Sequence, residues 1–143
     1  MRSCHRSLRL SALLACLLCC LSGCGSAPAV SREGLHGLLT FGPQTLGDIC
    51  VVVHRKEGTG FQQQGFGTTD QAGFFHLLKD GGQEPLVLEP GEYSFTLESV
   101  GPQIVFPAPF LKPETSPLTV TWTAEMISLD LQAPEELLAK LPK

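Results

Sequence analysis

The stretch Pro90-Gly91-Glu92-Tyr93-Ser94-Phe95-Thr96-Leu97-Glu98 decides the fold class of this 143-residue chain. Tyr93, Phe95 and Leu97 alternate there with polar residues, which is the period-two pattern of a β-strand with one apolar face. Pro90 presets the backbone φ angle and Gly91 permits a tight turn, so we expect the strand to begin directly after a chain reversal. Its apolar face has to be buried against another part of the chain.

Similar strand signals lie on both sides of this segment, bounded by glycine, proline or acidic turn residues. Besides the strand that starts at Pro90-Gly91, the expected strands cover residues 34–41, 48–55, 61–69, 74–78, 118–123 and 126–132. The near-continuous β-branched run in 48–55 predicts a strand buried on much of both faces. The polar, glycine-interrupted segment 61–69 is typical of a strand near a sheet edge. Together, seven short strands with turn signals predict an all-β fold, an antiparallel two-sheet sandwich.

Two segments depart from this pattern. The segment from Gly101 to Pro117 contains five prolines. Proline lacks an amide hydrogen and is rare in central strands, so we expect an extended connection that crosses an end of the sheets. The tail, residues 133–143, carries Glu135 and Glu136 early and Lys140 late, which favours one or two helical turns.

The N-terminal residues have the features of an export signal. Three arginines within the first nine residues precede an apolar run from Leu10 to Leu21, which is too short to span a hydrocarbon layer that needs about 20 residues. The segment Leu21-Ser22-Gly23-Cys24 resembles the lipobox of bacterial lipoproteins. The resemblance implies cleavage before Cys24 and a diacylglycerol on its sulfur, and a cleaved secretory peptide without lipid is the alternative. Several acyl chains on one residue give durable membrane anchoring.

These signals divide the chain into four parts. We expect a signal peptide (1–23), a lipidated N-terminus with a flexible tether (24–33), the β-sandwich (34–132) and a short tail (133–143). The expected location is the bacterial cell envelope, with the protein anchored by lipid on its periplasmic face or at the outer membrane. Gly25 stands where an acidic residue often marks inner-membrane retention, which favours the outer membrane.

Charge and cysteine content limit the function classes. The leader holds three of the ten basic residues and none of the 14 acidic residues, so the rest of the chain carries seven positive and 14 negative charges, a net charge of −7. This balance argues against nucleic-acid binding, which needs concentrated Lys and Arg. Four of the six cysteines lie in the leader. If Cys24 carries lipid, Cys50 has no disulfide partner, and we expect it to be a small core residue within an apolar run.

Two turn motifs carry a family resemblance. Thr69-Asp70-Gln71-Ala72-Gly73-Phe74-Phe75 and Pro90-Gly91-Glu92-Tyr93 resemble the T-D-x-x-G-x-F and P-G-x-Y turns of carboxypeptidase regulatory-like and transthyretin-like domains. The resemblance covers about residues 34–132 and implies a noncatalytic sandwich of the transthyretin-like or immunoglobulin-like type. The motif residues Asp70, Gly73, Pro90, Gly91 and Tyr93 then have structural roles, in which Asp70 accepts backbone hydrogen bonds and Gly73 takes a positive φ.

Candidate reactive groups are few. His54 and Glu57 have the H-x-x-E spacing of a zinc site, and His76 is the candidate third ligand. Asp70, Asp80 and Glu84 are candidate calcium ligands, but calcium requires six to eight oxygens. We expect no catalytic residue, no metal and no cofactor.

The expected function is that of a lipid-anchored, noncatalytic structural or protein-interaction module, with the membrane as its partner through Cys24. A carbohydrate- or peptide-binding module is the alternative, with Trp122, Tyr93 and the loop 106–110 as its contact surface. Exposed aromatic side chains would favour this binder, and buried ones the structural module. A small zinc hydrolase is the third alternative. A partner protein would bind by pairing one of its strands with the edge strand expected over residues 61–69.

Overall fold

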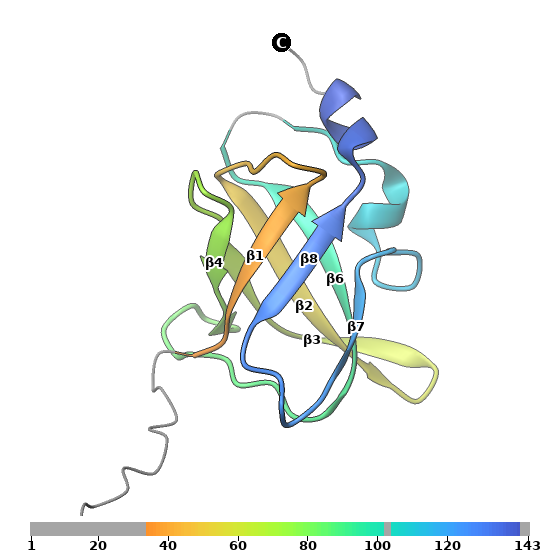
Figure 1. Cartoon of the computed structure of the whole chain (residues 1–143). Coiled ribbons are helices and arrows are strands. Elements are labelled where there is room, and N and C mark those ends of the chain that lie inside the picture. The colour runs from red at the N-terminus through yellow and green to blue at the C-terminus, as the bar shows by residue number, and fades with distance from the viewer. Residues whose placement is uncertain (1–33, 102–103, 141–143) are drawn as a thin grey trace, which may run out of the picture. The chain divides into compact units, whose positions relative to one another are not determined.

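Two β-sheets packed face to face form the described part of the chain (Figure 1). The computed structural model describes residues 34–101 and 104–140, so the predicted signal peptide, Cys24 and the tether lie outside the described residues. The predicted all-β sandwich is confirmed. No helix within the described ranges is long and apolar enough to cross a membrane.

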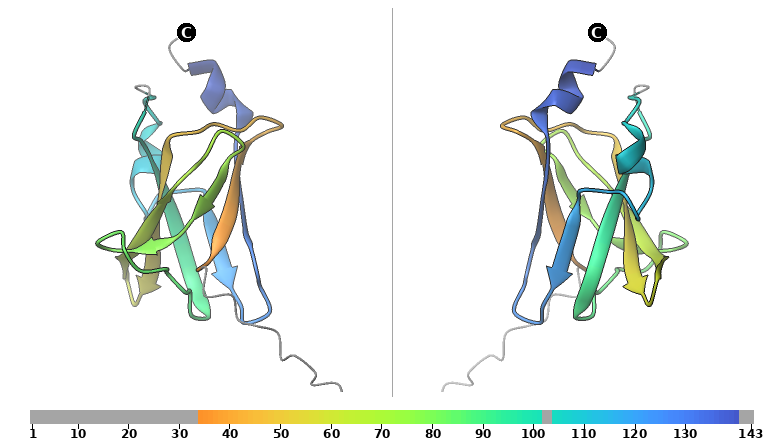
Figure 2. Two further views of the ribbon diagram at one scale, coloured as in Figure 1. Left: turned by 90° about the vertical axis from the view of Figure 1, so that its left-hand side faces the viewer. Right: turned by 90° about the vertical axis from the view of Figure 1, so that its right-hand side faces the viewer.

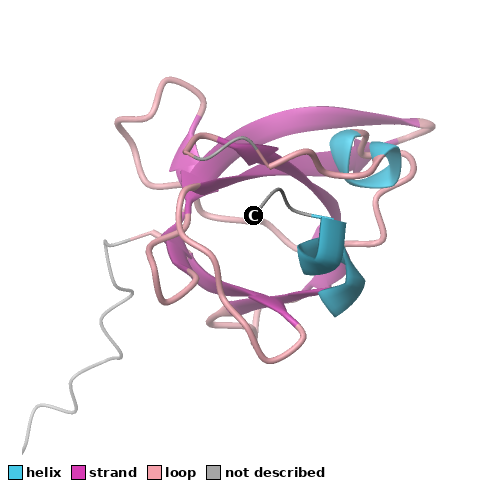
Figure 3. Ribbon diagram, turned by 90° about the horizontal axis from the view of Figure 1, so that it is seen from above, coloured by secondary structure: helices cyan, strands magenta, loops and turns pink. Residues whose placement is uncertain are grey.

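The larger sheet has five strands and the smaller sheet has three. In spatial order the larger sheet contains β5 (Leu78–Lys79), β3 (Gly60–Thr68), β2 (Ile49–Glu57), β6 (Gly91–Ser99) and β7 (Thr119–Trp122). The smaller sheet contains β4 (Phe74–His76), β1 (His36–Phe41) and β8 (Leu129–Ala133). The side views show the two sheets as separate layers (Figure 2). Seen from above, the sheets face each other around the interior, and the two 3₁₀ helices, η2 (Ala108–Leu111) and η3 (Glu135–Lys140), lie toward one side (Figure 3).

The interior is filled by alternate residues of the long central strands. Val51 and Val53 of β2 and Phe95 and Leu97 of β6 are fully buried, so the apolar face predicted for β6 is confirmed. β2 is buried on much of both faces, because Cys50 and Val52 are also covered. Phe41 and Phe75 add large side chains from the smaller sheet, and burying such residues supplies most of the free energy that favours folding.

The strand pairing departs from the prediction in one sheet. β1 pairs antiparallel with β4 but parallel with β8, in register from Gly37 opposite Leu129 to Phe41 opposite Ala133. The cause is the return of the chain from β7, in the larger sheet, to the smaller sheet through residues 123–128. It enters the smaller sheet at the end where β1 begins, so β8 runs in the same direction as β1 (Figure 1).

The single strand predicted over residues 74–78 was wrong, because the chain changes sheet within it. β4 belongs to the smaller sheet and β5 to the larger sheet. Leu77, between them, is fully buried, and its amide donates to the Leu35 carbonyl (2.8 Å) while its carbonyl accepts from the Leu86 amide (2.9 Å). These bonds satisfy the backbone where it passes between the layers.

The proline-rich segment does more than cross an end of the sheets. Phe106 stacks on Phe41 with ring centroids 6.3 Å apart and so helps to close one end of the core. Farther along, the Pro113 carbonyl accepts a hydrogen bond from the Ser94 hydroxyl (2.7 Å), on the face of β6 opposite the core. Ser94, which the alternation placed on a polar face, is consequently buried, and Thr96 on the same face is buried as well.

Candidate functional site

The first predicted turn is held by an acidic side chain. Asp70 Oδ1 accepts hydrogen bonds from the amides of Ala72 (2.9 Å) and Phe74 (3.0 Å). Gly73 has a φ of 81°, and a Cβ atom at this position would lie 2.6 Å from the Leu39 carbonyl oxygen. Both residues therefore shape the turn that leads into β4.

Thr69, at the start of the same motif, joins two loops through its buried hydroxyl. The hydroxyl donates to the Leu46 carbonyl oxygen (2.7 Å) and accepts from the Ile49 amide (3.0 Å). The Thr69 carbonyl is already occupied by the Asp48 amide (2.9 Å), so the hydroxyl takes the place of a backbone acceptor for Ile49. Asp48 itself adopts a left-handed φ of 62°.

The second predicted turn surrounds a buried tyrosine. Tyr93 is 3% exposed, and its hydroxyl donates to the carbonyl oxygen of Glu89, four residues earlier (2.8 Å). Burial raises the pKa of Tyr93, and the nearby Arg55 guanidinium partly opposes this effect. Pro90 and Gly91 connect the two bonded residues, so the P-G-x-Y motif closes a short loop against the start of β6.

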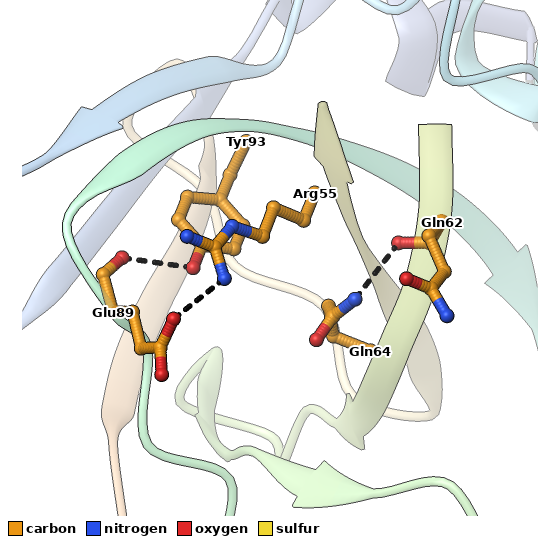
Figure 4. A network of polar contacts seen from close by, with 5 residues as sticks. All are labelled: Arg55, Gln62, Gln64, Glu89 and Tyr93. Atoms are coloured by element: carbon orange, nitrogen blue, oxygen red, sulfur yellow. Dashed lines mark hydrogen bonds and ion pairs between the residues drawn. The ribbon is translucent and has the colours of Figure 1, made fainter. Parts of the chain in front are cut away.

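An open pocket of about 420 Å³ lies beside this turn. Arg55 and Tyr93 lie side by side on the pocket wall, and Arg55 Nη1 donates to Glu89 Oε2 at 2.7 Å (Figure 4). This bond raises the pKa of Arg55. The second cation of the wall, Lys79, pairs with Glu84 (2.8 Å). The pocket can donate and accept hydrogen bonds, but both of its cations already have anionic partners.

The candidate zinc ligands do not come together. His54 Nε2 lies 2.9 Å from the Thr96 hydroxyl in the larger sheet, whereas His76 belongs to β4 in the smaller sheet. Burial lowers the pKa of His54, and the carboxylates of Glu114, Asp80 and Glu98 partly oppose this shift. Glu57 is exposed at the end of β2. Within residues 34–101 and 104–140, no three His, Cys, Asp or Glu residues are grouped to hold a metal.

The candidate calcium ligands are likewise engaged elsewhere. Asp70 holds its own turn, Asp80 accepts from Gln63 Nε2 (2.9 Å), and Glu84 pairs with Lys79. Cys50 is buried, as expected of a core residue, and burial followed by the charge of Glu98 raises its thiol pKa.

The aromatic contact surface expected of a carbohydrate or peptide binder is not formed by the residues named for it. Trp122, Tyr93, Phe106 and Phe110 are each at most 6% exposed and belong to the core. Phe106 and Phe110 come from the proline-rich segment, which the sequence pattern gave no reason to place in the core.

Two features of the structure had no signal in the local sequence. The Arg55–Glu89 pair joins residues 34 positions apart, and His36 and His76 face each other across β1 and β4 with ring centroids 6.1 Å apart. The register of β1 with β4 brings the two histidines together, and the register of β2 with β6 places Arg55 opposite Tyr93, whose hydroxyl bonds to Glu89. A correct pairing of the strands would have been needed to find either feature.

No protein-family model, no curated protein and no solved structure matches this chain.

Proposed function

We propose that this chain is a lipid-anchored, noncatalytic β-sandwich that acts as a structural or protein-interaction module on the bacterial cell envelope. The sequence support is the lipobox-like segment ending at Cys24 and the resemblance to carboxypeptidase regulatory-like domains. The structural observation that carries the proposal is the burial of the large aromatic side chains in the core. Trp122, Tyr93, Phe106 and Phe110 contribute to one shared core and so stabilise the sandwich itself.

The proposed interaction surface is the outer edge of β3 between Gly60 and Gln64. Among the described strands, β5 covers β3 only at Gly65 and Phe66, whereas β2 pairs with the whole length of β3. The backbone from Gly60 to Gln64 therefore borders no further strand of the described chain. An extended peptide segment can add to such an edge through main-chain hydrogen bonds, and Gln62 and Gln63 present exposed polar side chains there.

The anchor is tested by metabolic labelling of the full chain with palmitate in a bacterial host. We expect label to enter the wild type and not the Cys24→Ser variant, because the thiol would carry the diacylglycerol. Equal labelling of both proteins, or none of either, would remove the anchor from the proposal.

The interaction surface is tested with a photo-crosslinking residue introduced at Gln63 in the membrane-bound protein. The matched control carries the same residue at Thr121, which is exposed on β7 at the other edge of the same sheet. We expect a defined crosslinked product from position 63 and not from position 121. A reactive group that yields no product at position 63 in intact cells contradicts the proposed edge.

A further inference from the structure

His36 and His76 form an exposed pair on the outer face of the smaller sheet. They are register partners in the antiparallel β1–β4 pair, and both side chains are exposed. The neighbouring residues Leu39 and Phe75 point into the core and are buried, which places both imidazoles on the opposite side. Their ring centroids are 6.1 Å apart, and the ring planes are inclined by 54°.

The backbone hydrogen bonds show that this position favours close side chains. The Leu77 amide donates to the Leu35 carbonyl, and the Leu39 amide donates to the Gly73 carbonyl. The hydrogen-bonded positions therefore alternate with the His36–His76 position, which is a non-hydrogen-bonded pair. Side chains directly opposite each other at such positions approach more closely than at the hydrogen-bonded ones.

We propose that His36 and His76 bind a divalent transition-metal ion such as Ni²⁺, Cu²⁺ or Zn²⁺. Imidazole nitrogen is a good ligand for these ions, whereas Mg²⁺ and Ca²⁺ prefer oxygen. A tetrahedral ion with nitrogen ligands at about 2.0–2.1 Å holds two of them about 3.3 Å apart. Each ring nitrogen lies about 1 Å from its centroid, so rings 6.1 Å apart can bring facing nitrogens to about 4 Å. Small rotations of the exposed side chains close the remaining difference.

The site would hold its ion through two protein ligands. Among the described residues no third His, Cys, Asp or Glu completes a cluster with the pair, so water or a donor from outside the described chain occupies the other positions. Binding by both imidazoles requires β1 and β4 to be paired. The ion therefore binds the folded sandwich more tightly than the unfolded chain and stabilises the fold.

The test is the thermal midpoint of the full chain, followed by the fluorescence of Trp122, with and without Ni²⁺. We expect 1 mM Ni²⁺ to raise the wild-type midpoint by about 5 °C or more, EDTA to reverse the rise, and Mg²⁺ to have no effect. Loss of one ligand in His36→Ala or His76→Ala should weaken the apparent affinity at least about tenfold, since even changes beyond the direct ligands cost 10- to 100-fold. His54→Gln is the matched control, because His54 lies on the other sheet.

The difference between wild type and variants in the Ni²⁺-induced rise of the thermal midpoint distinguishes this site from other metal-binding groups of the chain. Ions held by the cysteines of residues 1–33 are common to all variants and leave the difference between the variants unchanged. A thermal unfolding curve of each variant in EDTA shows whether it still folds. The single variants His36→Gln and His76→Gln provide a second pair of ligand substitutions. A wild type without a midpoint rise, or a rise that both single variants retain in full, overturns the proposal and leaves only adventitious binding.

Discussion

Replacement of Thr69 by valine should destabilise the sandwich strongly, although the two side chains have nearly the same shape. The Thr69 hydroxyl donates to Leu46 and accepts from Ile49, and both bonds are at least partly buried. Valine would leave one carbonyl and one amide without these partners. A buried polar group left unsatisfied costs about 1–3 kcal/mol, so we expect a loss of about 2–4 kcal/mol in the free energy of unfolding. For a domain of this size the midpoint should fall by about 8–16 °C.

The assay is urea unfolding followed by the fluorescence of Trp122, the single tryptophan of the chain, which is buried. Thr68→Val is the matched control because Thr68 precedes Thr69 in sequence and is exposed. We expect this control to stay within about 0.5 kcal/mol of the wild type. Thr69→Ser keeps the hydroxyl, so it should lose less than half of the stability that Thr69→Val loses. Thr69→Val and Thr68→Val that unfold at the same urea concentration would refute the reasoning.

The remaining predictions concern a turn, a histidine and a thiol. Gly73→Ala should cost about 2 kcal/mol or more, because a Cβ there meets the backbone at a positive φ, whereas Gly81→Ala, with open space around it, should cost about 1 kcal/mol in the same urea assay. Burial lowers the pKa of His54, so the contribution of the neutral imidazole to stability is present above the ordinary pKa of about 6.5 and is lost as the pH falls through the folded-state pKa. The free energy of unfolding of His54→Gln, measured from pH 8 to 5, should therefore depend less on pH than that of the wild type. An unchanged pH dependence would contradict this. The Cys50 thiol, with its pKa raised by burial, should react with iodoacetamide at pH 8 far more slowly in the folded protein than in urea, and equal rates would show that it is accessible.

The parts of the fold that the sequence predicted are those governed by local pattern. The alternation of Tyr93, Phe95 and Leu97 identified a strand and its buried face, and the β-branched run around Val51 identified a strand covered on both sides. In both segments the side-chain period is a property of neighbouring residues, so it can be read without knowing the rest of the fold.

The parts that the sequence did not predict depend on which strands become neighbours. The change of sheet at Leu77 and the parallel pairing of β8 have no local signature, because each is fixed by contacts with distant strands. Ser94 was placed on a polar face by its pattern, but Pro113 covers it and supplies the acceptor that makes its burial tolerable.

The prediction of the candidate site failed for the same reason. His54 and His76 have a plausible sequence context for ligands, yet they belong to different sheets. The pairing of His76 with His36 follows only from the register of β1 with β4. The burial of Phe106 likewise depends on where a proline-rich connection returns to the core, and composition alone gives no information about that path.

The parallel pairing of β1 with β8 sets the order in which the molecule can be completed. Gly37 and its partner Leu129 are separated by 92 positions along the chain. A polypeptide that emerges N-terminus first, from a ribosome or from a channel, therefore leaves one edge of β1 without its β8 partner until Leu129 and the residues after it have appeared. A truncation just before Leu129 would leave that edge of β1 unpaired and the smaller sheet one strand short.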